Sequence, residues 1–315
     1  MIALCVESSH TRGMGHFFRS CVLADALVAA GHAVKFYVNE HPPTATLLRR
    51  RGIPFDIVPL DDAGQDWERA AIARDGIGLW IYDCHRTDIR SAMRIKAAGI
   101  PLVTFDDRGS GAAVTDLHIA ALAFEPDEEL AGNRVMRGVE YLMLDPTIPA
   151  YRRQRTSAEK LIVTLGGADT YGVTLKVMRL LSKAGRKATI VVGPAFMHGD
   201  DLSRQATTDF TIKRGVPSLI EEFAKHDVAV TGGGMTPFEA NASGLPCLVI
   251  ANEDFEIPVG RELEKLGGAL FAGHHSKLDE SLFAFDLPVE TMSSAALQRI
   301  PIDGARRVVE AVLSI

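Results

Sequence analysis

Several features that define other protein classes are missing from this chain of 315 residues. Its four cysteines, Cys5, Cys21, Cys84 and Cys247, are scattered, with no Cys-x-x-Cys pair and no local cluster with histidine. This pattern excludes a disulfide scaffold and favours buried free thiols in a reducing compartment over metal ligands. No run approaches the roughly 18 consecutive apolar residues of a spanning helix. We therefore expect no metal site and no membrane span.

An excess of positive charge is also missing. Lysine and arginine number 34 against 40 aspartates and glutamates, which gives a net charge of −6. A surface that coats nucleic acid is therefore not expected, and an anionic ligand must be held locally by backbone amides and a few side chains. The first residues, MIALCVESS, begin as a strand without the basic segment of a secretory signal, so the sequence predicts a cytoplasmic protein. The 47% of hydrophobic residues excludes disorder.

Short apolar runs alternate along the chain with longer stretches of helical period. Continuous apolar runs bounded by Gly, Pro or Asp are typical of strands in a parallel sheet that is covered on both faces. Two series of such runs predict two α/β units, each with a parallel sheet. The predicted strands are Ile2–Val6, Ala33–Val38, Leu79–Tyr82, Leu102–Phe105, Leu117–Ala120, Leu161–Leu165, Ala188–Val192, Val228–Thr231 and Cys247–Ile250.

Helices are predicted between these strands, and the apolar periodicity stops near the middle of the chain. The interruption at Leu144–Glu159 carries two prolines and a basic cluster, which favours a linker between domains 1–150 and 151–315. The clearest predicted helices end near a glycine, a common helix C-cap, and a final amphipathic helix is expected at 303–314. They are His16–Ala30 before Gly31, Leu175–Lys183 before Gly185, and Pro237–Ser243 before Gly244.

Three glycine turns connect predicted strands to predicted helices. Glycine lets the backbone approach a ligand, and the amides and dipole at the start of a helix favour an anion. A single such turn is usually only a tight connection, but three at the carboxyl ends of strands lie where open α/β sheets bind ligands. The turns comprise Gly13, Gly15 and His16; Gly166 and Gly167; and Gly233, Gly234, Met235 and Thr236.

Two familiar phosphate-binding motifs do not fit these turns. Phe18 stands where the dinucleotide fingerprint needs a third glycine, which disfavours NAD. No Gly-Lys-Ser/Thr follows any of the turns, so a P-loop is excluded. No cofactor is therefore expected.

His16 is the most suggestive single residue because it begins a helix directly after a Gly-x-Gly turn. The positive end of the helix dipole favours the neutral imidazole, which suits a general base, although a lone histidine is more often a cap or a packed side chain. Asp83, at the end of a predicted strand, could orient an imidazole or cap a helix. For Asp106 and Asp107 we favour a structural role, as partners of Arg108 or as caps.

Glu239 lies about one turn into the predicted helix at Pro237–Ser243. Its carboxylate could accept hydrogen bonds from a diol such as ribose or could compensate the helix dipole. Spacing alone does not decide between these two roles.

The motifs together resemble a known family, the UDP-sugar hydrolases of the pseudaminic acid pathway. Gly13-Met14-Gly15-His16-Phe17-Phe18-Arg19 followed by Leu23-Ala24 is similar to the family's G-x-G-H-x-x-R…L-A signature. Later signatures follow in the same order over roughly residues 2–270, although the last is shared with the wider MurG-like glycosyltransferases. They are Phe105-Asp106-Asp107, Leu165-Gly166-Gly167-Ala168-Asp169, and Gly233-Gly234-Met235-Thr236 with Glu239 and Gly244-Leu245-Pro246.

The resemblance implies a fold, a reaction and a set of site residues. It implies a GT-B-like fold, in which two Rossmann-like domains face each other across a cleft, and metal-independent hydrolysis of UDP-2,4-diacetamido-2,4,6-trideoxy-β-L-altropyranose. It places the catalytic base at His16. The diphosphate and ribose fall on the turn from Gly233 to Thr236 and on Glu239, and Gly13, Gly15, Arg19, Gly166 and Gly167 join them as substrate-binding residues.

Two positions depart from the family pattern near the sugar or the nucleophile. Asn252-Glu253 stands in place of the usual Asn-Gln, which exchanges an amide for a carboxylate. Asp83-Cys84-His85 stands in place of Asp-x-Tyr, so Asp83 is a candidate catalytic residue and His85 a candidate substrate contact.

We therefore expect a hydrolase that releases UDP from a UDP-linked acetamido-deoxy sugar. One alternative is a GT-B glycosyltransferase that uses the same donor site with a sugar or lipid-linked acceptor in place of water. Another is a non-catalytic protein that binds nucleotide sugars. The sequence does not give the sugar, the base or the oligomeric state, and the stretch from about Lys277 onward matches no part of the family pattern.

Overall fold

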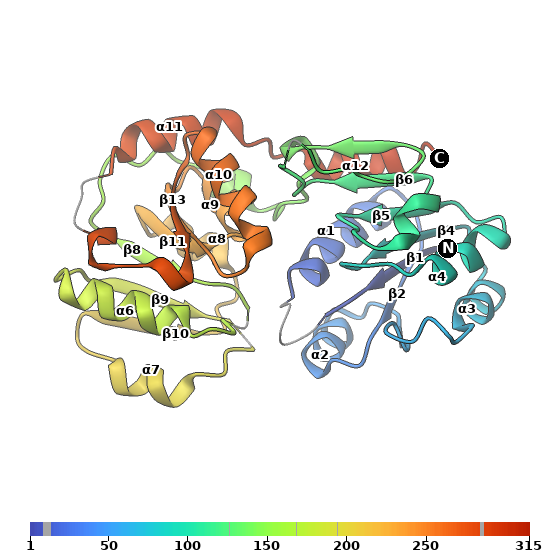
Figure 1. Cartoon of the computed structure of the whole chain (residues 1–315), viewed down its shortest axis with the longest axis horizontal. Coiled ribbons are helices and arrows are strands. Elements are labelled where there is room, and N and C mark those ends of the chain that lie inside the picture. The colour runs from blue at the N-terminus through green and yellow to red at the C-terminus, as the bar shows by residue number, and fades with distance from the viewer. Residues whose placement is uncertain (9–13, 126, 168, 194, 284–286) are drawn as a thin grey trace. The chain divides into compact units, whose positions relative to one another are not determined.

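The computed structural model describes residues 1–8, 14–125, 127–167, 169–193, 195–283 and 287–315. The chain divides into two compact units, which are treated separately below (Figure 1). Of the described residues, unit 1 holds 1–8, Met14–Met143 and Asp303–Ile315, and unit 2 holds Leu144–Ile302. Both ends of the chain thus belong to unit 1.

Unit 1 is built on a parallel sheet of seven strands within its described residues, in the order β3-β2-β1-β4-β5-β6-β7. The order reverses beside β1, as in Rossmann-like sheets. Val6, at the end of β1, pairs with Asp83, at the end of β4, so these strands finish at the same level. The strands are β1 Ile2–Val6, β2 Val34–Val38, β3 Phe55–Ile57, β4 Leu79–Asp83, β5 Leu102–Phe105, β6 Leu117–Ala120 and β7 Val135–Arg137.

Helices cover both faces of this sheet. Alternate residues of β1 point to opposite faces, so Leu4 packs with α1 and α12, while Cys5 packs with Trp80 and α4. The helices are α1 Gly15–Ala29, α2 Pro42–Arg51, α3 Trp67–Asp75, α4 Ile89–Ala97 and, from the far end of the chain, α12 Gly304–Val312.

Helix α12 corrects the predicted domain assignment. The sequence places residues 303–314 in the C-terminal domain, whereas in the structure Val308, Ala311 and Val312 are buried in the same core as Leu23 and Leu27 of α1. Figure 1 shows α12 with unit 1. A contiguous split at residue 150 is therefore wrong at this helix, because its apolar stripe is buried on α1.

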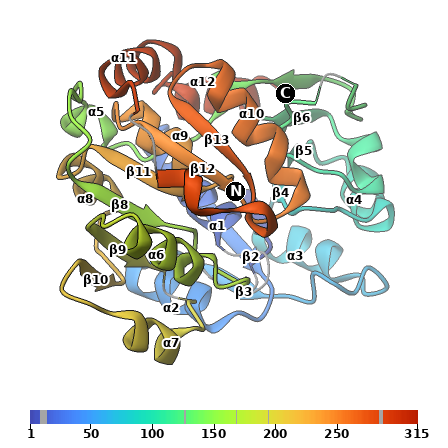
Figure 2. The same ribbon diagram turned by 60° about the vertical axis from the view of Figure 1, so that its left-hand side comes forward.

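Unit 2 contains a second parallel sheet, of six strands in its described residues, in the order β10-β9-β8-β11-β12-β13. Figure 2 shows β8, β11 and β12 in the middle of this sheet. Val228–Thr231 of β11 pair with Leu161–Thr164 of β8, and the next strand is β12. The strands are β8 Leu161–Thr164, β9 Ala188–Val192, β10 Phe210–Arg214, β11 Val228–Gly232, β12 Cys247–Ala251 and β13 Ala269–His274.

The helices of unit 2 follow its strands in regular alternation. Gly185 and Gly244 follow α6 and α9 with φ of 64° and 80°, the left-handed conformation expected of helix C-caps. A short 3₁₀ turn, η3 at Asp254–Glu256, precedes α10. The helices are α5 Ile148–Tyr151, α6 Val173–Lys183, α7 Gly199–Gln205, α8 Leu219–Ala224, α9 Thr236–Ala242, α10 Ile257–Lys265 and α11 Val289–Arg299.

The segment predicted as a linker is anchored to unit 2 at its basic cluster. Arg155 is fully buried, and its guanidinium donates to the carbonyls of Phe223, at 3.0 Å, and of Ser243. Burial lowers the pKa of Arg155 to about 10, and the neighbouring charge of Arg153 acts in the same direction. A buried arginine therefore ties the segment that the sequence predicted as a linker to unit 2.

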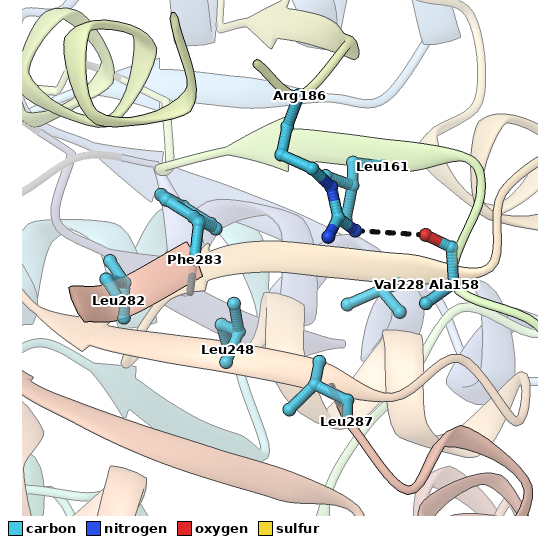
Figure 3. Close-up of a pocket in the computed structure, with 8 residues that line it drawn as sticks. All are labelled: Ala158, Leu161, Arg186, Val228, Leu248, Leu282, Phe283 and Leu287. Atoms are coloured by element: carbon cyan, nitrogen blue, oxygen red, sulfur yellow. Dashed lines mark hydrogen bonds between the residues drawn. The ribbon is translucent and has the colours of Figure 1, made fainter. Parts of the chain in front are cut away.

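A small cavity lies under the sheet of unit 2 (Figure 3). Its volume is ≈ 20 Å³, enough for about one water molecule. Leu161 and Val228 open their strands and Leu248 is near the start of its own, so the cavity lies toward the amino ends of the strands. It is thus far along the sheet from the glycine turns and is too small for a ligand.

The described residues contain neither a membrane-spanning helix nor a metal-binding cluster. No helix there has the length and apolar character needed to cross a bilayer. No group of three or more His, Cys, Asp or Glu side chains in that part of the chain is arranged to hold a metal ion.

Candidate functional site

The carboxyl edge of the unit 1 sheet brings His16 and Asp83 together. His16 is the second residue of α1, and Asp83 ends β4, which is hydrogen-bonded to β1. Their side chains meet with His16 Nδ1 2.6 Å from Asp83 Oδ1. Residues 67 positions apart in the chain thus form one pair because neighbouring parallel strands end at the same level.

Asp83 is a buried carboxylate with many donors. Its side chain is 1% exposed, and it accepts hydrogen bonds from Arg19 Nε and Nη2, at 2.9 and 2.6 Å, and from Ser20 Oγ at 2.7 Å. Burial alone raises the pKa of this carboxyl. The positive charge of Arg19 and the contact with His16 lower the pKa by more than burial raises it, so it lies well below its usual range. Asp83 is therefore ionised and can only accept hydrogen bonds.

The ionised partner fixes the tautomer of His16. Because Asp83 only accepts, Nδ1 of His16 carries the hydrogen and donates it, which leaves the lone pair of the neutral ring on Nε2. The side chain of His16 is 26% exposed, so this edge of the ring can meet solvent. An imidazole oriented in this way by a buried carboxylate is the arrangement of a general base.

Arg19 has a different place from the one that the sequence suggested. It is 5% exposed, and its guanidinium bridges Asp83 and Asp106. Asp106 has φ of 46° and also accepts from the amide of Leu122 at 2.9 Å. The resemblance places Arg19 among the substrate contacts, whereas in the structure its donors face two buried carboxylates.

The remaining candidates in unit 1 are less decisive. His85 is half-buried, and its carbonyl accepts from the amide of Arg108 at 3.0 Å. Asp107 accepts from the amides of Thr87 and Gly109, at 2.9 and 2.7 Å, which agrees with the structural role favoured for it. Gly13 lies outside the described residues.

Gly15 opens α1 and is exposed. A Cβ added there would meet no heavy atom within 4 Å, and the residue is not among the glycines with positive φ. The fold therefore does not require glycine at this position.

The turn after β8 is explained by the fold itself. Gly166 has φ of 90°, and a Cβ on Gly193 would lie 2.5 Å from the Cα of Gly167, so this connection packs tightly against the loop after β9. Asp169 caps α6, with its two oxygens 2.8 and 2.9 Å from the amides of Val173 and Thr174. The helix start that could have received an anion already holds a carboxylate of its own.

The turn after β11 is more open. Gly234 has no positive φ, and a Cβ built on it would meet nothing within 4 Å, so the fold does not need glycine there. Met235 and Thr236 are partly exposed, and α9 begins at Thr236. A glycine without a structural reason is typical of a backbone that a ligand approaches closely.

Glu239 lies in α9 and is partly buried. Burial raises its pKa to about 7, and the charge of Asp145 acts in the same direction. The carboxyl of Glu239 is thus near its titration midpoint at neutral pH.

Glu256, which the sequence reasoning did not single out, contacts the same turn. Its Oε2 accepts from the amide of Gly233 at 3.2 Å and from that of Asn252 at 2.7 Å. Asn252 and Glu253 follow β12, and Glu253 accepts from the hydroxyl of Tyr171 at 2.7 Å. The only available signal was that Glu256 comes a few residues after the end of a strand.

The chain matches no protein-family model but has measurable relatives. It is 22% identical over 328 residues to the spore coat polysaccharide biosynthesis protein SpsG of Bacillus subtilis (strain 168), with 98% of this chain and 94% of that protein covered. Among solved structures, MurG of Acinetobacter baumannii superposes with a TM-score of 0.70 at 13% identity, over 100% and 99% of the two chains. The fold is that of the GT-B glycosyltransferases.

A second solved structure supports the same conclusion. Anabaena Alr3699/HepE, determined in complex with UDP, superposes with a TM-score of 0.68 at 14% identity. The superposition covers 100% of this chain and 100% of that one. The predicted fold class, two Rossmann-like units with parallel sheets, is thereby confirmed.

Proposed function

We propose that this protein is a hydrolase that releases UDP from a UDP-linked acetamido-deoxy sugar. UDP-2,4-diacetamido-2,4,6-trideoxy-β-L-altropyranose, or a sugar related to it, is the substrate class that the sequence resemblance suggests. The observation that carries the proposal is the contact of 2.6 Å between His16 and the buried Asp83. It gives the imidazole a fixed tautomer with its basic nitrogen, Nε2, available to a water molecule.

Unit 1 supplies the base in this reaction. Nε2 of His16 takes a proton from water, whose oxygen forms a bond to the anomeric carbon. The bond between that carbon and the diphosphate oxygen breaks, and its electron pair leaves with UDP. Asp83 stabilises the imidazolium that forms and keeps the ring in place, as an orienting carboxylate does in other His–Asp pairs.

Unit 2 holds the nucleotide. The backbone from Gly233 to Thr236 binds the diphosphate, and Glu239 accepts hydrogen bonds from the ribose. Asn252 and Glu253 are assigned to the sugar. The open space at Gly234 supports this placement, as does the UDP bound to Anabaena Alr3699/HepE, a protein of the same fold.

A glycosyltransferase is the second candidate because the solved structures with this fold are glycosyltransferases. The same His–Asp pair would then deprotonate an acceptor hydroxyl instead of water. The role of SpsG in polysaccharide biosynthesis is compatible with both reactions.

The test combines binding and turnover. Nucleoside diphosphates and nucleotide sugars are screened by thermal unfolding, where a ligand at 100 times its dissociation constant should add about 2.7 kcal/mol of stability. Each hit is then incubated with the protein, and UDP release is measured with and without sugar or lipid-linked acceptors. Hydrolysis predicts release without an acceptor, and transfer predicts release only with one.

The outcomes separate the three hypotheses. Stabilisation by UDP-sugars that stay intact for hours would contradict both enzymatic functions and favour a binding protein. In the turnover assay His32→Ala is the matched control for His16→Ala, because this exposed histidine follows the other end of α1 from His16.

A further inference from the structure

Glu256 occupies a backbone amide that the proposed function assigns to the diphosphate, together with a second amide beside it. Its Oε2 lies 3.2 Å from the amide nitrogen of Gly233 and 2.7 Å from that of Asn252. These two amides belong to the connections after β11 and β12, which are neighbouring strands of one sheet. A single carboxylate oxygen therefore bridges the two connections.

The backbone around Gly233 is shaped to admit this glutamate. A Cβ on Gly233 would come within 2.6 Å of the Cβ of Glu256 and 3.0 Å of its carbonyl oxygen. The glycine at 233 is thus explained by η3 packing against the turn, whereas the glycine at 234 faces open space. The turn has one side closed by Glu256 and one side open.

The surroundings of Glu256 disfavour its charged form. Burial raises the pKa of its carboxyl; the backbone hydrogen bonds lower it, and the negative charge of Glu253 raises it again. Glu253 is the charged residue that acts on it, and Asp254, the other acidic residue beside it in η3, is exposed. The turn from Gly232 to Met235 and the last residues of β12 carry no ionisable side chain, and the first ionisable residue of α10 is Arg261. The charge of Glu256 is therefore stabilised by backbone amides, those of Gly233, Asn252 and Glu253.

We propose that Glu256 is an internal anion that occupies the phosphate-binding amides of the empty protein, and that the ligand's diphosphate binds by displacing it. The proposal rests on the proposed function, because it takes the turn after β11 as the diphosphate site. Two anionic groups held at the same amides, partly shielded from water, repel each other strongly. An ionised Glu256 and a diphosphate therefore do not share these amides.

Competition with Glu256 has a consequence for affinity and pH. The measured dissociation constant of UDP is the intrinsic one divided by the fraction of protein whose amides are open. Protonation weakens the hold of Glu256 on the amides, so its contribution favours UDP binding as the pH falls. UDP itself titrates near pH 6, so only the difference between variants isolates Glu256.

The experiment is UDP binding by titration calorimetry from pH 5.5 to 8.5 with the wild type and three variants. Glu256→Gln keeps the shape without the charge, and Glu256→Ala removes the side chain. Glu262→Gln is the matched control, because this glutamate of α10 pairs with Lys265 and is not assigned to the binding site. Thermal unfolding of each variant checks that the fold is intact.

We expect Glu256→Gln and Glu256→Ala to bind UDP about tenfold or more tightly than the wild type at pH 8. The gain should shrink as the pH falls toward 5.5, and Glu262→Gln should not reproduce it. Equal affinities at every pH, or weaker binding by Glu256→Gln, would overturn the displacement while leaving UDP binding by the protein established. Absence of UDP binding by the wild type and by both Glu256 variants would overturn the proposed function as well.

Discussion

The carboxyl edges of the two sheets differ in the chemistry that they present. In unit 1 the edge is rich in charged side chains, and His16, Arg19, Asp83 and Asp106 form one ion-paired group. In unit 2 the edge is dominated by backbone, and the turn after β11 offers amides next to two glycines. Side chains with fixed protonation states suit proton transfer, whereas backbone amides suit the recognition of an anion.

Under the proposed function, this difference lets a chain with a net charge of −6 bind an anionic substrate. In unit 1 the buried arginine is already neutralised by two aspartates, so it is not free to attract phosphate. Recognition of the diphosphate then depends on the geometry of the backbone between Gly233 and Thr236. We expect substitutions in unit 1 to change turnover and stability, and those at the turn to change affinity.

The largest effect is expected at Asp83. Replacement of Asp83 by Asn removes one of the two buried carboxylates that pair with Arg19 and removes the charge partner of His16, which should cost about 3–5 kcal/mol of unfolding free energy and abolish most turnover. Urea unfolding measures the loss. The exposed pair of Asp25 and Arg51 on the same unit is the control, and Asp25→Asn should cost less than about 1 kcal/mol.

The pH dependence of the Asp83 effect has a definite sign. Because the pKa of Asp83 is lowered in the folded state, its stabilisation is complete above the unfolded pKa of about 3.9 and is lost as the pH falls below it. The difference in stability between the wild type and Asp83→Asn should therefore narrow below about pH 4. A difference that stays constant down to pH 3 would contradict an ionised Asp83.

Removal of the imidazole should separate chemistry from binding. His16→Ala should lower turnover by about 10²–10⁴-fold, the usual contribution of a general base, while the affinity for UDP stays close to that of the wild type. Steady-state kinetics and calorimetry measure the two quantities. Near-normal turnover in this variant would remove His16 from the mechanism.

Two glycine substitutions test the contrast within unit 2. Gly166→Ala forces a side chain into a φ of 90° and should cost about 1–2 kcal/mol of stability, with little effect on UDP affinity. Gly234→Ala meets no steric obstacle in the fold and should leave stability nearly unchanged, while a methyl group in the path of the diphosphate weakens UDP binding about tenfold. Thermal unfolding with and without UDP measures both stability and UDP binding for each variant. Equal changes in the two variants would contradict the proposed difference between the two turns.

The last effect, at Glu239, appears only as a dependence of stability on pH. Its pKa of about 7 lies above the ordinary value of 4.5, so the folded protein keeps a proton that the unfolded chain releases. Glu239 therefore makes the protein less stable as the pH rises from about 4.5 to 7, by roughly 1–3 kcal/mol. Glu239→Gln should remove this component, which denaturation at pH 5 and pH 7 measures against the wild type.

Much of the fold could be predicted from local patterns. The predicted strand at Ile2–Val6 is β1 itself, and those at Leu102–Phe105, Leu117–Ala120 and Ala188–Val192 also have the predicted bounds. Continuous apolar runs mark these strands because both faces are buried. The strands that the sequence did not show, β3, β7, β10 and β13, include the edge strands of both sheets. Their residues are only partly buried, so the apolar signal is weak.

The candidate site was predictable only in part. His16 and the three glycine turns follow from residue types at the ends of strands, and Asp83 was suspected for the same reason. The roles of Arg19 and Glu256 could not be read from the sequence. The resemblance places Arg19 among the substrate contacts, and only the pairing of β4 with β1 and β5 shows that two buried aspartates bind it.

The sequence by itself determined the alternation of strands and helices, the position of the turns and the lack of a broad basic surface, because periodicity, glycine placement and charge are local properties. The tertiary structure decided which carboxylate meets which donor. Asp83 reaches His16 across neighbouring strands, Asp169 caps its own helix, and Glu256 bridges two turns. The tertiary structure also places α12 in unit 1, because an apolar stripe is buried on the surface that lies near it in space and not on the one that precedes it in the chain.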